Sequence, residues 1–332
     1  MKIAFSARMA FCLAILFGLT ISQKVFAFTL RVPFTLQAPY SDWRQPWQDA
    51  CEEATILIVD QFYKGFQAER IPKKTAHDEI LRIVNIENKH FGFNKDTNVS
   101  QIVEIINNFF NWEAKEVEDP SVEDIKSELD MQRPVIVPLY GKQLNNPYFL
   151  RGGPDYHTVV VKGYDDETQE FITQEPGVGR GLDYRYSYDT LVNAMHDFLP
   201  ANKTKYGQKK AIFTQKNLQK SAELDGDKDG LTKIEEIKQG SALWLADSDD
   251  DGFDDGQETR EGYSPIVNEK KLVRGSLVKT KENPKVFLLD DESKRHIANE
   301  TIFLAHGWRW SDIIVVSERF LENLHEGAEI DN

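Results

Sequence analysis

The sequence predicts an α+β fold, and two observations predict it. Between residues 51 and 131 the apolar residues recur at helical spacing, whereas short apolar runs bounded by turn residues dominate from 134 to 214. Helices followed by strands favour α+β over an alternating βαβ chain. Two aspartate-rich repeats then interrupt the apolar pattern. They divide the chain into a large domain at 28–215, a repeat segment at 217–262 and a small mixed α/β module at 270–332.

The first 27 residues are typical of a secretory signal peptide. Lys2 and Arg8 precede an apolar run, Met9–Ile21, and small residues precede a cleavage point after Ala27. An uncleaved anchor is the alternative, but this run is shorter than the ~20 residues that a membrane span needs. No later segment is apolar enough to span a membrane, so the cleaved protein is expected to be secreted or at the cell surface and not integral to the membrane.

Charge and cysteine content narrow the function. The formal charge is −14, and because residues 1–27 hold three basic and no acidic side chains, cleavage would leave −17. Such a chain is not expected to bind nucleic acid, whereas cations such as calcium are natural partners. Cleavage would also remove Cys12 and leave Cys51 as the single cysteine. Cys51 is then either an inert core residue or a nucleophile.

The order of helices and strands follows from the apolar periodicity and from the residues that start or stop each element. In the large domain helices are expected at 51–63, 75–88, 100–110, 121–131 and 188–198, and strands at 134–140, 156–164, 170–176 and 210–214. The helix at 121–131 opens with the capping box "SVED". In the last module we expect a hairpin around Asp290–Ser293, a short helix stopped by Gly307, and a strand at "DIIVV".

The position of the Cys51 thiol is compatible with a catalytic role. Cys51 begins a predicted helix, and a helix N-terminus favours a thiolate. His157 begins a strongly apolar strand and could serve as the base, while Gln174 or Glu175, at the end of the next strand, could orient its ring.

These residues resemble a known family. "VPFTLQAPYSDW", "QDACEEA", "YHTVVVKGYDD" and "FITQEPGVGRG" are similar to papain-like cysteine peptidases of the double-glycine (bacteriocin-processing) type, and more closely to their secreted stand-alone relatives. The resemblance covers about residues 31–200 and implies a papain-like domain. It makes Cys51 the nucleophile, His157 the base and Gln37 a donor to the oxyanion, a role for which Gln45 and Gln48 compete.

The sequence departs from the family at two places. The aspartate that usually precedes the proline is replaced in "QEP", so Glu175, one methylene longer, or Gln174 would hold the imidazole. The usual glycine after the cysteine is Glu52, followed by Glu53. These two acids would favour the helix start but oppose a thiolate.

The two repeats match calcium-binding loops. In "DGDKDGLTKIEE" and "DSDDDGFDDGQE", aspartates alternate, a glycine permits the turn, and a glutamate is the twelfth residue. Both resemble thrombospondin-type-3 or dockerin-like repeats, and a solvated acidic linker is the alternative. The expected ligands are Asp225, Asp227, Asp229, the Leu231 carbonyl and Glu236, and then Asp247, Asp249, Asp251, the Phe253 carbonyl and Glu258.

The sequence therefore predicts an exported cysteine peptidase or amide hydrolase with a calcium-stiffened spacer and no cofactor for catalysis. Residues 277–330 look similar to a C-terminal module of secreted wall-associated proteins, so a cell-wall component is a second candidate partner beside a peptide or amide substrate. The alternative is a calcium-dependent cell-surface binding protein whose papain-like domain does not cleave. An activated Cys51 would react rapidly with an alkylating agent, and a core cysteine would not.

Overall fold

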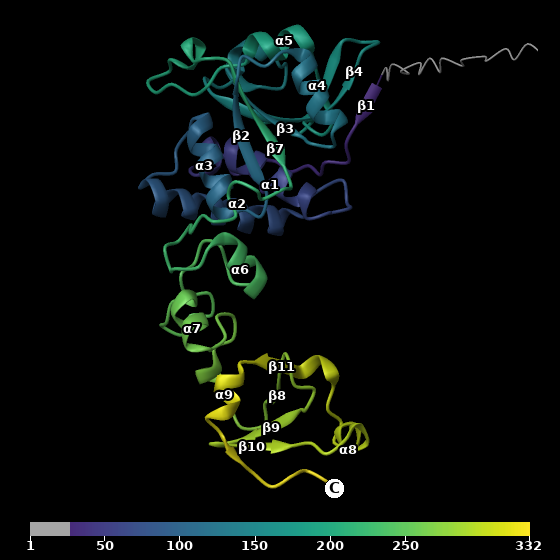
Figure 1. Ribbon diagram of the computed structural model, residues 1–332. Helices are drawn as coiled ribbons and strands as arrows, with labels where there is room; N and C mark the ends of the chain where they lie inside the picture. Colours follow the sequence, from purple (N-terminus) through teal and green to yellow (C-terminus); the bar gives the residue numbers. More distant parts are fainter. Residues whose placement is uncertain (1–26) are drawn as a thin grey trace, which may run out of the picture.

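Three parts follow one another along the long axis of the molecule in the computed structural model (Figure 1). The structure describes residues 27–332, so the predicted signal peptide, apart from Ala27, lies outside the described residues. Residues 27–215 form the N-terminal domain, two short helices with long loops follow, and a small sheet ends the chain. None of the helices in the described part combines the length and apolar character that a membrane span needs.

The N-terminal domain is built on an antiparallel sheet in the order β2-β7-β3-β4-β5-β6, with β1 beside β4. Its strands are β1 (Ala27–Thr29), β2 (Glu113–Glu118), β3 (Val135–Leu139), β4 (His157–Asp165), β5 (Glu170–Gln174), β6 (Tyr184–Ser187) and β7 (Lys210–Gln215). The middle strands β3 and β4 are buried almost throughout, which suits their runs of valine. The predicted strands at 134–140, 156–164, 170–176 and 210–214 are confirmed.

Helices cover the sheet on two sides, with α1, α2 and α3 on one side and α4 and α5 on the other (Figure 1). They are α1 (Cys51–Tyr63), α2 (Lys73–Phe91), α3 (Val99–Phe109), α4 (Val122–Asp130) and α5 (Tyr188–Ala194), with 3-10 turns η1 (Trp47–Asp49), η2 (Gly141–Leu144), η3 (Leu150–Gly152) and η4 (Thr204–Tyr206). α1 packs on β4 and is itself covered by α2, so its first ten residues are all buried. The Thr55 hydroxyl on α1 lies 3.5 Å from the Thr158 hydroxyl on β4, so the start of α1 runs beside the start of β4.

One predicted helix was too long, and edge strands of the sheet were missed. The helix expected at 188–198 ends at Ala194, because Met195 pairs with Leu139 and the His196 N–H donates to the Pro138 carbonyl. The strand β2 was missed because its sequence, "EAKEVE", is mostly charged. β2 is an edge strand of the sheet, where charged side chains can reach water.

The repeat segment packs directly against the N-terminal domain. Its elements are α6 (Lys233–Gln239) and α7 (Asp255–Glu261), and η5 (Glu269–Lys271) follows the segment. The fully buried Lys233 donates from Nζ to the carbonyls of Asn107 (2.9 Å) and Trp112 (3.4 Å). The guanidinium of Arg82 on α2 lies 4.2 Å from the ring centre of Trp244. The first repeat is therefore anchored on α2 and α3.

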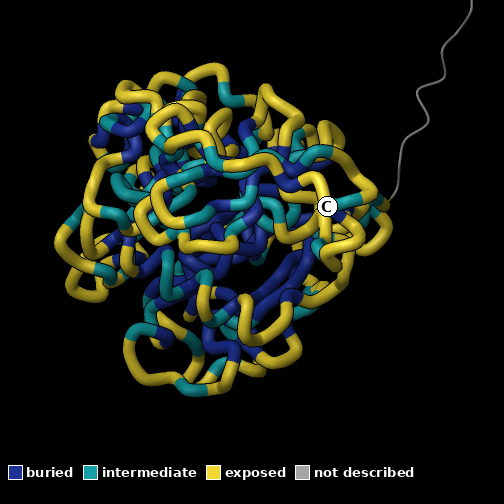
Figure 2. The backbone as a smooth tube through the Cα atoms, turned by 90° about the horizontal axis from the view of Figure 1, so that it is seen from below, coloured by how far each residue is buried: buried dark blue, intermediate teal, exposed yellow. Residues whose placement is uncertain are grey.

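The C-terminal module is a five-stranded sheet in the order β11-β8-β9-β10-β12. Its elements are β8 (Leu277–Thr280), β9 (Phe287–Asp290), β10 (Ser293–His296), β11 (Ile313–Val316), β12 (His325–Glu326), α8 (Glu300–Ala305), α9 (Glu318–Glu322) and η6 (Trp310–Asp312). The predicted hairpin is the β9–β10 pair, and the predicted helix stop is Gly307, at φ +75°. Across the whole molecule, seen from below, buried residues gather inside and exposed ones line the outer loops (Figure 2). The module has two small apolar clusters, whereas one large cluster fills the N-terminal domain.

Candidate active site

Cys51 is the first residue of α1, as predicted, and it is the one free cysteine among residues 27–332. The 3-10 turn η1 leads the chain into the helix, and Ala50 at the N-cap offers no side-chain cap. As the first helical residue, Cys51 has a backbone N–H without an acceptor inside the helix. This N–H and the positive end of the helix dipole both point toward the region before α1.

The thiol is turned into the protein. Its Sγ donates to Oε2 of Glu52 over 2.9 Å, and the cysteine is only 3% exposed. Burial, then the carboxyls of Glu52 and Asp96, raise the pKa of the Cys51 thiol well above its usual value. Within the described part of the chain no hydrogen bond joins the thiol to His157. The resting thiol is therefore protonated and bonded to the Glu52 carboxyl, whose own pKa is raised well above its usual value by burial, then by Asp96 and Glu53.

His157 begins β4, beside the start of α1, and is 2% exposed. Its Nε2 lies 2.5 Å from Oε1 of Glu175, so the carboxylate accepts from the ring when Nε2 carries the proton. The Phe149 ring meets the imidazole edge-on, with 5.4 Å between ring centres. Gly177 is required on another side, because a Cβ there would lie 2.9 Å from the imidazole Cε1. The ring is thus fixed, with Nδ1 left for another partner.

Glu175 holds the imidazole, and Gln174 does not touch it. The carboxylate is fully buried, and the Gly177 N–H donates to Oε1 and the Tyr186 hydroxyl to Oε2, each over 2.8 Å. Gln174 instead donates to the Val32 carbonyl (2.6 Å) and accepts from the Asp183 N–H. Of the two alternatives left by the sequence, the structure assigns the ring contact to Glu175.

Gln37 lies against the turn before Cys51. Its side-chain amide donates to the carbonyls of Trp47 (3.0 Å) and Gln48 (3.1 Å), so both amide hydrogens are used. Its backbone N–H donates to the Pro176 carbonyl, next to Glu175. Gln37 therefore joins the loop before α1 to the strand end that carries Glu175. Of its competitors, Gln45 is exposed and donates to Asp49, and the Gln48 side chain is exposed.

Comparison with known proteins decides the family. Residues 29–206, more than half of the chain, match the Peptidase C39-like family. The chain belongs to this family. A solved structure from Bacillus anthracis, described as a proposed C39-like peptidase, is similar over 57% of this chain and 98% of that chain, at 16% identity and a TM-score of 0.39. No curated protein matches the chain.

Membership indicates a cysteine peptidase-like domain, and in this C39-like domain the candidate residues are covered. Cys51, His157, Glu175 and Gln37 are each less than 5% exposed. The loop 141–155 brings Phe149 onto the imidazole.

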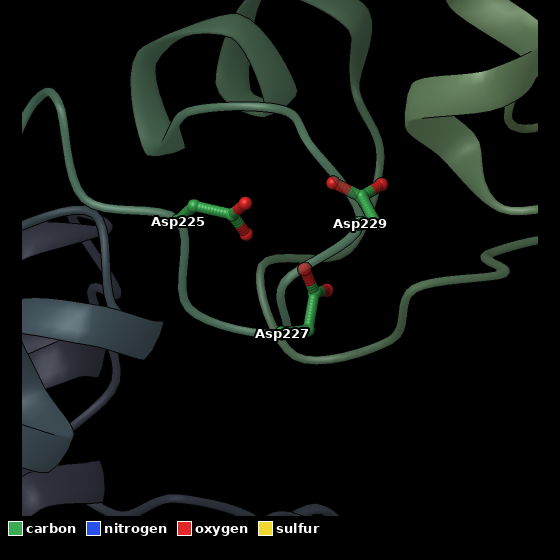
Figure 3. A group of neighbouring side chains, drawn as sticks. All are labelled: Asp225, Asp227 and Asp229. Atoms are coloured by element: carbon green, nitrogen blue, oxygen red, sulfur yellow. The ribbon is translucent and has the colours of Figure 1, made fainter.

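The first aspartate repeat brings three of its five predicted ligands together. The carboxylates of Asp225, Asp227 and Asp229 turn toward one another (Figure 3), with ligand oxygens within 4.8 Å of each other. Both oxygens of Asp227 are buried without a hydrogen-bond partner, and so is Oε1 of Glu236, which is 1% exposed. Burial, then the neighbouring carboxylates, raise the pKa of Asp227 to about 7 and that of Glu236 to about 8. Leu231 donates its N–H to Asp229 within the same loop.

The second repeat has the same construction with one difference. Asp247, Asp249 and Asp251 converge, and both oxygens of Asp249 are buried without a partner, as is Oε2 of Glu258. Here, however, Nζ of Lys270 lies 3.1 Å from Asp251 Oδ2.

Two of the predicted ligands in the second repeat also have raised pKa values. Burial, then nearby carboxylates, raise the pKa of Asp249 to about 6 and that of Glu258 to about 8. Phe253 donates its N–H to Asp251, within the loop. Two oxygen-rich clusters with unpaired buried carboxylates fit a hard divalent cation, and Lys270 competes for the second.

The two repeats are interlocked. Oδ2 of Asp229, in the first loop, accepts from the backbone N–H of Gly256 at the start of α7 (2.9 Å). A Cβ at Gly256 would lie 2.2 Å from the Asp229 carbonyl, so only glycine permits this approach. The ligand set of one loop thus touches the helix that carries Glu258 of the other.

Several functional contacts were missed from the sequence. The sequence placed Glu52 beside the thiol as an opposing charge but not as its hydrogen-bond partner. Tyr186, Thr97 and Phe149 gave no signal, because they are single residues that belong to no motif containing Cys51 or His157. The "QEP" departure was the signal that the third position needed a separate assignment.

Proposed function

We propose that the chain is a cysteine peptidase in which Cys51 is the nucleophile, His157 the base and Glu175 the residue that orients the base. The observation that carries this is the buried 2.5 Å contact between His157 Nε2 and Glu175 Oε1, at the start of the strand that packs on α1. Family membership supports the same function.

In this proposal each nitrogen of His157 has one role. Since Nε2 is held by Glu175, Nδ1 is the atom that accepts the thiol proton. Sγ then attacks the carbonyl carbon of the scissile amide, and the Cys51 backbone N–H stabilises the oxyanion. Nδ1 returns the proton to the leaving amine, and water hydrolyses the thioester. Gln37 can contribute only if it gives up one of its two carbonyl partners.

Removal of the sulfur tests this proposal. Cys51→Ala should abolish cleavage of peptides that the wild-type protein cleaves, found by screening a peptide library, while the melting temperature changes little. His157→Ala should abolish it too. Activity that persists in Cys51→Ala would refute the nucleophile assignment.

A second candidate function is binding without cleavage, and one observation favours it. The thiol is buried, protonated and bonded to Glu52 and not to His157. A domain of this kind would bind a peptide without cleaving it. Wild type and Cys51→Ala would then bind the same peptides, and neither would release product.

We also propose that the repeats bind two calcium ions. Asp225, Asp227, Asp229 and Glu236 would hold one, and Asp247, Asp249, Asp251 and Glu258 the other, with the carbonyls of Leu231 and Phe253 as further ligands. The support is the buried oxygens that have no partner in either cluster. The ion would neutralise carboxylates that otherwise repel one another, so its role is structural.

Calorimetry on the protein, titrated with calcium after chelation, tests this role. Two ions should bind, Asp227→Asn should weaken one site, and Asp249→Asn should weaken the other. Protein that takes up no calcium at millimolar concentration would refute it.

The proposed cellular location rests on residues 1–27. Their pattern supports export, so we propose a secreted or cell-surface enzyme acting on peptides or other amides, with a wall component as a candidate partner of the C-terminal module. Secretion of the full chain, with an N-terminus at Phe28 determined by sequencing, is the expected result.

A further inference from the structure

Glu52, which directly follows the proposed nucleophile, is the hydrogen-bond partner of the Cys51 thiol. The Cys51 thiol donates to Oε2 of Glu52, and the other oxygen of that carboxylate accepts from the Thr97 backbone N–H (2.7 Å). The Tyr156 hydroxyl fixes Thr97 in turn by donating to its carbonyl (2.9 Å). Glu52 is 1% exposed, so its carboxylate has no room to turn toward water. Both of its oxygens are therefore committed, one to the sulfur and one to the backbone.

We propose that Glu52 is a positioning residue that holds the Cys51 thiol in a resting orientation, hydrogen-bonded to Glu52 and not to His157, and that catalysis requires the sulfur to exchange Glu52 for the imidazole. The proposal rests on Cys51 being the nucleophile. The step is a change of hydrogen-bond partner. The S–H bond first points to the Glu52 carboxylate, then to His157 Nδ1, and the proton moves to Nδ1 when Sγ attacks.

The charges around this pair act in the same direction as the contact. Asp96, before α3, is the charged neighbour that acts most strongly on the Cys51–Glu52 pair. The other ionisable groups that face the pair or Asp96 are Glu53 on α1, Glu87 on α2, Lys95 before α3, Asp49 on η1, and Asp155, Tyr156 and His157 at or just before the start of β4. Most are acids, and they disfavour a thiolate. The positive end of α1 opposes them, but the Glu52 carboxyl in contact with the sulfur is nearer. Burial, then Asp96 and Glu53, raise the pKa of Glu52 itself well above its usual value, so the hydrogen-bond contact, more than a full negative charge, holds the thiol.

One part of this acidic group provides a matched control. Glu53 and Glu87 are both buried, and their side chains are hydrogen-bonded to each other. Burial, then the nearby Glu52, raise the pKa of Glu87 to about 8. Two carboxyls in contact share one proton, so Glu87→Gln leaves the charge of this pair near its original value. Glu87→Gln therefore changes a buried acid without touching the sulfur.

The experiment is a pH titration of the thiolate by its ultraviolet absorbance, with the Cys51→Ser spectrum subtracted to remove tyrosine. Wild type should show thiolate only above the usual range of a thiol, about 8.5. Glu52→Gln, whose amide can donate to the sulfur, should lower the midpoint by at least about one pH unit, which is tenfold more thiolate at pH 7. Glu87→Gln should shift it by less than half as much. If Glu52→Gln does not fold, Glu52→Met replaces it.

Three outcomes would overturn the inference. They are a wild-type thiolate already formed at pH 7, a Glu52→Gln midpoint that does not fall, and a Glu87→Gln shift as large as that of Glu52→Gln. The last would show that total charge, and not the contact, controls the sulfur. The readout is independent of hydrolysis. A wild-type protein that cleaves peptides with an unshifted thiol would refute the inference alone, and one that titrates as expected but cleaves nothing would refute the proposed function alone.

Discussion

The length of the side chain at residue 175 should matter more for turnover than its charge. Glu175 reaches His157 Nε2 over 2.5 Å from a carboxylate that also accepts from Gly177 and Tyr186. Glu175→Asp withdraws the carboxylate by one carbon–carbon bond, about 1.5 Å, and stretches this contact beyond hydrogen-bonding distance. A hydrogen bond to a charged group contributes about 1.5–3 kcal/mol, so kcat/KM should fall about 10- to 150-fold.

Glu175→Gln should be tolerated better. The Gly177 N–H requires an oxygen at the Oε1 position, so the amide oxygen stays on His157 and the amide nitrogen faces the Tyr186 hydroxyl. The ring keeps its tautomer and orientation and loses only the charge of its partner. A neutral bond in place of a charged one costs about 1 kcal/mol, or about a fivefold loss in kcat/KM.

Steady-state kinetics on a fluorogenic peptide cleaved by wild type would measure this order, with Gln174→Ala as the control. Gln174 bonds only to Val32 and Asp183, so Gln174→Ala should lower the melting temperature and change kcat/KM by less than about threefold. If Glu175→Asp is as active as Glu175→Gln, or if Gln174→Ala is the most impaired, Glu175 does not act through its reach to the imidazole.

Three further predictions concern the repeat segment. Lys270→Ala should tighten calcium binding at the second site only, because Nζ occupies an oxygen of Asp251; unchanged calorimetric affinity would contradict this. In calcium-free protein, burial and the neighbouring carboxylates raise the pKa of Asp227 to about 7 and that of Glu236 to about 8, from usual values near 4. The folded protein therefore binds these protons more tightly than the unfolded chain does. The free energy of unfolding should fall as pH rises from about 4 to 8. Calcium should remove this fall in calorimetric melting, and stability that rises over the same range would refute the assignment. Lys233→Ala leaves the Asn107 carbonyl without its donor and should destabilise the protein by about 2–3 kcal/mol in urea unfolding, whereas Lys238→Ala should be nearly neutral.

The sequence predicts the parts of the site that depend on local pattern. Cys51 at a helix start and His157 at a strand start follow from apolar periodicity, and both are confirmed. Gln174 and Glu175 could not be separated, because the strand register and the path of the chain after β5 decide which one meets the ring. The thiol partner could not be predicted either, since it depends on a side-chain rotamer and on a buried backbone N–H, that of Thr97.

The missed elements have a related explanation. β2 and β6 are edge strands, and their sequences alternate charged or polar residues with few aliphatic ones. Such strands are stabilised by pairing with a neighbour and not by burying both faces, so periodicity alone gives them little signal. The predicted helix at 188–198 was too long for the same reason, because pairing of Met195 with Leu139 replaced the last turn.

The hydrogen bond from Gly256 to Asp229 has a consequence for how the repeats respond to calcium. An ion that orders Asp229 also fixes the start of α7, and that helix carries Glu258 toward the second loop. If the repeats bind calcium as proposed, the first ion would lower the ordering cost of the second site, and uptake would be cooperative. A cooperative pair changes from loose to rigid over a narrow range of calcium concentration. The distance between the C39-like domain and the C-terminal module would then be set by a threshold, with little gradual change on either side of it.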